Sequence, residues 1–157
     1  MPDDARARAI AAIDDALAAS GLDVERAGEA RWHLTLSGEH KRTVPTVIEV
    51  DERHVTLQTF FMRAPDENAD ALYAYLLRRH RRSYVFRFAL TDDGDVLLVG
   101  VVPHAAVDAD EVDRLLGQLL ATADESFTQA LRLGFASYIE REQAWRAKVG
   151  APPNPIT

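Results

Sequence analysis

The sequence contains no cysteine, and this absence excludes disulfide bonds, thiol catalysis and cysteine-bound metal ions. Long apolar runs are also absent: the longest, VLLVGVV from Val96, is far shorter than the roughly 20 residues that a membrane-spanning helix needs. The first residues carry acidic side chains among the arginines and no long apolar core, which is typical of a helix rather than a secretory signal. We therefore expect a cytoplasmic protein without a membrane segment.

Motifs of common catalytic sites are absent as well. The sequence has no GxSxG nucleophile elbow, no GxxxxGK[ST] phosphate loop and no GxGxxG turn, and its five histidines lack the i, i+4 spacing of a helical zinc pair. The acidic turn at Asp92, Asp93 and Asp95 is similar to the start of a calcium loop, but Gly100 stands where such a loop needs a glutamate. The sequence therefore predicts no catalytic residue, no metal and no cofactor, and TDDG predicts a type I′ turn.

Acidic side chains outnumber basic ones by 25 to 18, and the formal net charge is −7. Such a chain repels polyanions at long range, so nucleic-acid binding would need a strongly segregated basic patch. The candidate patch is RRHRR, residues 78–82, which we interpret mainly as the end of a helix, where cations interact favourably with the helix dipole. In the alternative interpretation, Tyr84, Phe86 and Phe88 stack on RNA bases, but the glycine-aromatic motif of RNA-binding sheets is missing. We do not expect a nucleic-acid partner.

Apolar periodicity predicts eight elements. A first helix stops at Gly21, and a second follows the candidate caps Asp66 and Asn68 and ends at the arginine cluster. Alternation of apolar and polar residues predicts strands at 31–36, 46–50, 54–62, 84–90 and 95–102. With a last helix, this order is α-β-β-β-α-β-β-α, an α+β fold with an antiparallel sheet packed against helices. Residues 1–150 form one predicted domain, and the proline-rich residues 151–157 predict a flexible tail.

The last predicted helix is unusually long. Asp108 and Glu111 are typical of its start, and an apolar stripe runs from Val112 at steps of three and four, which favours one helix of about 40 residues over two. That helix would span ~60 Å, whereas a domain of this size is roughly 40 Å across. It must either bend, with Gly134 as the candidate position, and wrap across its own sheet, or overhang. An overhang would leave Phe135, Ile139 and Trp145 to be buried against a partner or a second copy.

Three stretches carry a family resemblance: LRRHRRSYVFRFALTDDGDVLLVG, VDRLLGQLLATADESF and LGFASYIEREQAWRAKVG. Together they resemble the actinobacterial branch of the YbjN-domain family, described as regulators of sensory transduction, and the likeness covers roughly residues 32–150. The resemblance implies the fold of type III secretion chaperones. It also implies dimers that present sheet and helix surfaces to an extended segment of a client protein, but no catalytic residue.

Residues and resemblance together predict a non-catalytic protein-binding or regulatory module, chaperone-like and homodimeric. The predicted partner contacts are Phe135, Ile139, Trp145, Arg63, Arg78 and Arg82. The alternative is a sensor of a small anion or phosphometabolite, or an enzyme with a cryptic site. In that case Arg63, the cluster at 78–82 and Arg146 supply anion contacts, because guanidinium forks suit phosphate and carboxylate.

Overall fold

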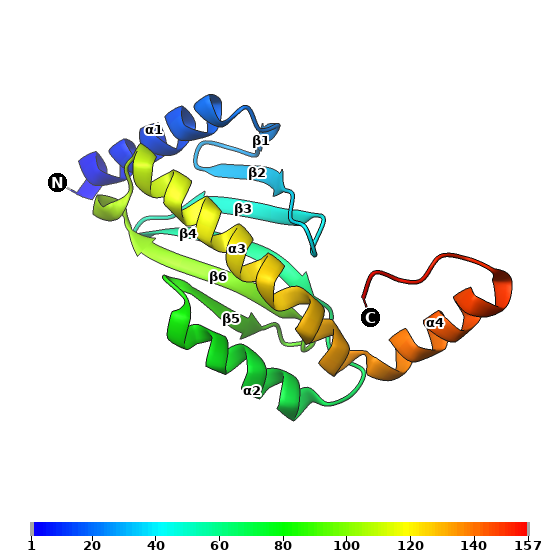
Figure 1. Ribbon diagram of the computed structural model, residues 1–157. Helices are drawn as coiled ribbons and strands as arrows, with labels where there is room; N and C mark the ends of the chain where they lie inside the picture. Colours follow the sequence, from blue (N-terminus) through cyan, green and yellow to red (C-terminus); the bar gives the residue numbers. More distant parts are fainter. Residues whose placement is uncertain (1, 157) are drawn as a thin grey trace.

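Helix α1 (Pro2–Ser20) opens the computed structural model, which describes residues 2–156 and is shown in Figure 1. It stops where the sequence predicts, because Gly21 adopts a φ of 71°, a left-handed conformation that costs glycine little. The other helices are α2 (Ala69–Arg79), α3 (Ala109–Gly134) and α4 (Ala136–Val149), with short 3₁₀ turns η1 (His80–Arg82) and η2 (His104–Ala106). None of the helices in the described part is long and apolar enough to cross a bilayer.

Six antiparallel strands form one sheet in the order β1-β2-β3-β4-β6-β5. Their bounds are β1 Val24–Arg26, β2 Arg31–Leu36, β3 Val44–Val50, β4 His54–Met62, β5 Phe86–Leu90 and β6 Val96–Pro103. The predicted α+β class, the antiparallel pairing and the order of the eight elements are confirmed, with two differences. Strand β1 is additional to the predicted elements, because its three residues are too short to show alternation. The last helix is also divided.

The core lies between one face of the sheet and the helices. Alternate strand residues point to this face, where α1 and α3 cross the sheet and α2 packs beside α3 (Figure 1). Burial along α3 follows the predicted stripe at steps of three and four. The largest buried side chains are Trp32, Phe61, Phe86, Ile13, Ile48, Leu57, Leu72, Leu98, Leu115 and Leu119.

The turn between β5 and β6 differs from the prediction. A type I′ turn needs positive φ at both central residues, but among the described residues other than glycine only Asn68 has a positive φ. The Gly94 N–H instead donates to the Thr91 carbonyl at 2.9 Å, and Gly94 itself takes a φ of 86°. This is a three-residue loop made of a type I turn followed by a left-handed glycine. The carboxylate of Asp95 accepts the N–H of Ala64 at 2.8 Å, so it holds two loops together.

The prediction of one continuous last helix is wrong, because the chain breaks at Phe135, with a φ of −137°. The segment before α2 causes the break. The N–H groups of Asp66 and Glu67 donate to the Gly134 carbonyl at 3.0 and 3.2 Å and so satisfy the open end of α3. The carboxylate of Glu67 then accepts the N–H of Ser137 at 2.6 Å, which caps the start of α4. The bend predicted near Gly134 is thus a complete interruption.

Helix α4 leaves the body of the molecule, and residues 150–156 fold back along it (Figure 1). Gln143 and Asn154 exchange two hydrogen bonds, at 2.9 and 3.0 Å, and the Arg146 guanidinium donates to the Pro152 carbonyl at 3.1 Å. The flexibility of residues 151–157 stays a prediction, and Thr157 lies outside the described residues. These contacts give the tail a defined position as a second layer on α4.

Candidate binding groove between the sheet and the last helix

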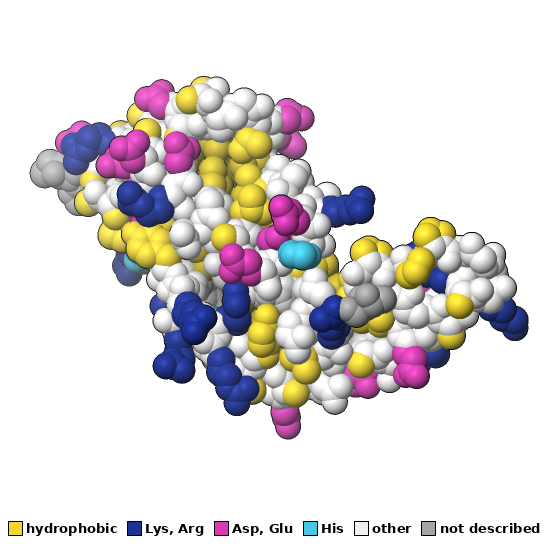
Figure 2. All heavy atoms as spheres, in the orientation of Figure 1, with side chains coloured by type: hydrophobic (Ala, Val, Ile, Leu, Met, Phe, Trp, Pro, Cys, Tyr) yellow, Lys and Arg dark blue, Asp and Glu magenta, His cyan; other side chains and the backbone are white. Residues whose placement is uncertain are grey.

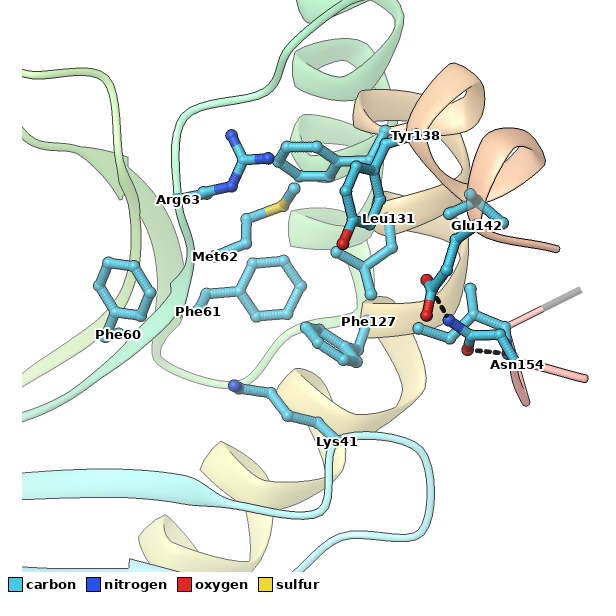
Figure 3. Close-up of a pocket in the computed structure, with 13 residues that line it drawn as sticks. Lys41, Phe60, Phe61, Met62, Arg63, Phe127, Leu131, Tyr138, Glu142 and Asn154 are labelled. Atoms are coloured by element: carbon cyan, nitrogen blue, oxygen red, sulfur yellow. Dashed lines mark hydrogen bonds between the residues drawn. The ribbon is translucent and has the colours of Figure 1, made fainter. Parts of the chain in front are cut away.

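A groove separates the body from α4 and the returning tail, and it is visible as a notch in Figure 2. Its volume is about 400 Å³, within the usual range for ligand sites, and it is open to solvent on one side. Figure 3 shows its lining, which combines the end of β4 with α3, α4, the tail and the loop before β3. The lining residues are Lys41, Phe60, Phe61, Met62, Arg63, Phe127, Leu131, Phe135, Tyr138, Ile139, Glu142, Asn154 and Ile156.

A bulge in β4 arranges the aromatic wall. The pairing of β4 with β6 shifts between Phe60 and Met62, so Phe61 and Met62 are both buried although they are adjacent. Phe61 meets Phe127 edge to face, with ring centroids 5.9 Å apart. Phe60 points the other way, as Figure 3 shows, and is 45% exposed. It therefore joins the groove to the opposite face of the sheet.

Arg63 is held at the rim of the groove by two interactions. Its guanidinium donates to both oxygens of Asp66, at 2.8 and 3.1 Å, and lies over the Phe135 ring, 4.2 Å from the centroid. The hydrogen bonds from Arg63 hold the pKa of Asp66 below its ordinary value. Phe135 beneath is only 5% exposed. Arg63 is therefore a fixed rim group whose charge is already neutralised.

The carboxylate of Glu142 is likewise satisfied. It accepts from Arg146 Nε at 2.9 Å and from Asn154 Nδ2 at 2.7 Å. Arg146 thus braces α4 and the tail through Glu142 and Pro152, and the anion contact considered for it stays a prediction.

Lys41 contributes the remaining cation of the groove. The N–H groups of His40 and Lys41 both donate to one oxygen of Asp124, at 2.8 Å each, and so fix the loop before β3 onto α3. The Lys41 ammonium lies 4.8 Å from the centroid of Phe127. Burial lowers the pKa of this lysine below its ordinary value.

The structure brings three of the six predicted contact residues together, since Arg63, Phe135 and Ile139 all line the groove. Trp145 lies farther along α4 and is 60% exposed. Arg78 and Arg82 line a separate hollow with Tyr75, Arg79 and Arg81, and Figure 2 shows this basic cluster over the end of α2. Sequence reasoning missed Lys41, Phe60, Phe127 and Tyr138 as a group, because they are far apart in sequence.

The arginine cluster ends α2 as predicted, with Arg78 and Arg79 in the last turn. Arg79 also pairs with Glu125 of α3 at 3.1 Å. His80 within the cluster makes contacts of another kind, because its Nε2 accepts the N–H of Phe88 at 2.8 Å and its ring stacks on that phenylalanine. Burial, and then the nearby charge of Arg87, lower the pKa of His80.

The face of the sheet opposite the helices forms a second apolar surface. Phe60 and Val101 are about half exposed on it, and Phe60 pairs with Leu97 across the strands. A shallow hollow of about 530 Å³ lies on this face. The apolar residues on this side of strands β3, β4 and β6, which we call the open sheet face, are Pro45, Val47, Phe60, Leu97, Val99 and Val101.

Known proteins share this sequence and fold. Residues 9–132 match the YbjN family, described as "Putative bacterial sensory transduction regulator". An uncharacterized protein of Mycobacterium tuberculosis is 47% identical over 117 residues, which cover 74% of this chain and 64% of the relative. An uncharacterized protein of Mycobacterium leprae is 36% identical over 151 residues, covering 93% of this chain and 82% of the relative.

Among solved structures, a chain of the heterodimeric ExoU-SpcU complex from the type III secretion system of Pseudomonas aeruginosa matches with a TM-score of 0.55. The identity is 21%, and the match covers 79% of this chain and 98% of that one. This likeness concerns the fold, and it confirms the predicted type III secretion chaperone-like architecture. Because the family match extends over most of the protein, from α1 to the end of α3, the chain belongs to the YbjN family.

Proposed function

We propose that the protein is a non-catalytic binding module that holds an apolar segment of a partner polypeptide on the open sheet face and forms a homodimer through α4. The apolar character of the open sheet face carries the proposal. Phe60 and Val101 are about half exposed on this face, Val47, Leu97 and Val99 are partly exposed beside them, and contiguous apolar patches of this kind mark contact sites. The likeness to a chain found in a heterodimeric complex supports the same interpretation.

The edges of the sheet indicate how the segment lies. At β5, the outward N–H of Phe88 is bonded to His80, and the Phe86 carbonyl accepts from the Ser83 hydroxyl and the Arg87 guanidinium, at 2.7 Å each. These contacts block the addition of a strand at β5. The segment therefore lies across the open sheet face rather than at the β5 edge.

Helix α4 supplies the second surface. Tyr138, Trp145 and Val149 are each more than half exposed, and their spacing of seven and four residues puts them on one face of the helix. None of the described residues of α4 is buried. In the proposed dimer the two copies of α4 bury this stripe, with Trp145 at its centre. Arg63, Ile139 and the buried Phe135 hold the helix at its base, and Arg78 and Arg82 border the opposite end of the body.

Site-specific photocrosslinking in the cells that make the protein tests this function. A photoreactive residue replaces Val101 on the open sheet face, Trp145 on α4, or Gln118 on the outer side of α3 as the matched control. Position 101 is expected to give an adduct with another polypeptide. Position 145 is expected to give an adduct with twice the mass of the 17.4-kDa monomer.

Equal labelling at Gln118 and at Val101 would show that the open sheet face has no special affinity for polypeptides, and would reject the partner site. A monomer without adducts at position 145, at a protein concentration where the adduct at 101 forms, would reject the dimer through α4. The two surfaces are thus judged separately.

A further inference from the structure

One charge in the groove has no counterpart. The ion pairs formed within residues 2–156 do not include Lys41, although this residue is partly buried. Its ammonium has the Phe127 ring as a neighbour, and a ring face compensates a buried cation only in part. The loop that carries Lys41 is fixed by Asp124, so the ammonium is held at the groove.

The other charged groups of the lining are engaged. Arg63 is bonded to Asp66 through two donors, and the Glu142 carboxylate is bonded to Arg146 and Asn154. The groove therefore offers a single available cation among aromatic and aliphatic walls. The apolar walls include Phe61, Met62, Phe127, Leu131, Ile139 and Ile156.

We propose that this cavity binds a small-molecule monocarboxylate with an aromatic or medium-chain aliphatic body, whose carboxylate pairs with the Lys41 ammonium. The apolar body fills the space between Phe127 and Ile139, and the groove volume of about 400 Å³ accommodates a molecule of this size. This ligand site borders the proposed polypeptide contacts, because Phe60 also belongs to the open sheet face and Tyr138 to the stripe of α4, whereas Lys41, Phe127 and Ile139 belong to neither.

The charge balance selects a monocarboxylate over a phosphate ester. A phosphate carries up to two negative charges and is best held by several donors such as arginine forks. Here one ammonium is available, and the guanidinium in the lining, that of Arg63, already has a carboxylate partner. A second negative charge would be desolvated against Phe127 and Leu131 without compensation, which is costly.

Titration calorimetry with octanoate and 4-phenylbutyrate tests the site in the full-length protein. The matched probes are 1-octanol and 4-phenyl-1-butanol, which keep the apolar body and lack the charge. The variants are Lys41→Met, which removes the charge and keeps the stem, Lys41→Arg, which restores a cation, and Ile139→Trp, which fills the cavity. Lys148→Met is the control, because Lys148 is the other lysine of the chain and is exposed on α4.

We expect the acids to bind at least roughly tenfold more tightly than the alcohols, since a hydrogen bond to a charged group contributes this much. Lys41→Met and Ile139→Trp are expected to weaken binding of the acids by a similar factor, whereas Lys41→Arg retains part of it and Lys148→Met leaves it unchanged. Circular dichroism establishes that each variant is folded.

NMR of the wild-type protein with ¹³C-dimethylated lysines gives a direct readout of ligand binding at Lys41. The two lysine signals are resolved by comparison with the variants, and octanoate is expected to shift the signal of Lys41 while that of Lys148 stays in place. Equal affinity for acid and alcohol, unchanged binding in folded Lys41→Met, or no shift at millimolar octanoate would each overturn the proposal. The crosslinking result at Val101 is independent of these outcomes.

Discussion

Two glycines show how differently single residues are constrained. Gly100 in β6 lies against Phe86, and a Cβ at position 100 would come within 2.5 Å of the Phe86 ring. Phe86 is fully buried and has no room to move away. Gly100→Ala is therefore expected to lower the free energy of unfolding by about 1–3 kcal/mol, the usual cost of overpacking a core. Urea denaturation followed by circular dichroism measures the change.

Gly117 in α3 is the matched control for this substitution. A Cβ there meets no atom within 4 Å, and the position is exposed in the interior of the helix. Gly117→Ala is expected to leave stability unchanged or raise it by up to about 1 kcal/mol, because alanine favours the helix more than glycine does. If both variants lose the same stability, the close approach of Phe86 to β6 does not explain the glycine at position 100.

At the scale of elements, His80 links the end of α2 to the edge of β5 and makes this link sensitive to pH. Its Nε2 accepts the N–H of Phe88, which requires the neutral ring, and its pKa is lowered in the folded chain. A histidine whose pKa is lower when folded binds fewer protons than in the unfolded chain. Stability is therefore expected to fall as the pH decreases through the ordinary histidine value of about 6.5 toward the folded value.

Urea denaturation of the wild type and of His80→Gln at pH 8 and pH 5.5 checks this expectation. Glutamine keeps an acceptor for the Phe88 N–H and does not titrate, so the variant should lose less stability between the two pH values than the wild type does. His40→Gln, at an exposed position, is the control and should retain the wild-type loss. The same pH dependence in His80→Gln would assign the titration to another group.

The same scale shows which elements are predictable from sequence. The inward face of β4 and the stripe of α3 repeat at periods of two and of three to four, so they are readable one element at a time. The break at Phe135 is not, because the groups that cause it, at Asp66 and Glu67, are about 70 residues away in sequence. The Asp-Gly pair correctly predicts a turn at Thr91–Asp95, but the loop has three residues rather than two, which changes its type.

At the scale of the whole molecule, the groove is a product of tertiary assembly. Its walls come from the loop at Lys41, the bulged end of β4, α3, α4 and the tail, and no local pattern in any of these indicates a shared cavity. Periodicity places Phe127 in the core stripe of the last helix. This is correct for the ring face that packs against Phe61, but the ring also lines the groove, which periodicity does not predict. The apolar residues Phe135, Ile139 and Trp145 are the part of the sequence that does indicate the groove, since they lie where α4 leaves the body.

The separation of α4 from the body predicts a difference in local stability that depends on protein concentration. Helix α3 is anchored by buried side chains along its length, whereas none of the described residues of α4 is buried. Hydrogen exchange should therefore be faster in α4 than in α3 or β6 in dilute protein, because α4 opens without disrupting the core. If two copies bury the stripe at Trp145, raising the concentration should protect α4 while α3 and β6 keep their rates. Trp145→Glu should abolish this protection. Protection of α4 equal to that of α3 in dilute protein would show that α4 is part of the core unit, and would remove the physical reason for a dimer at this helix.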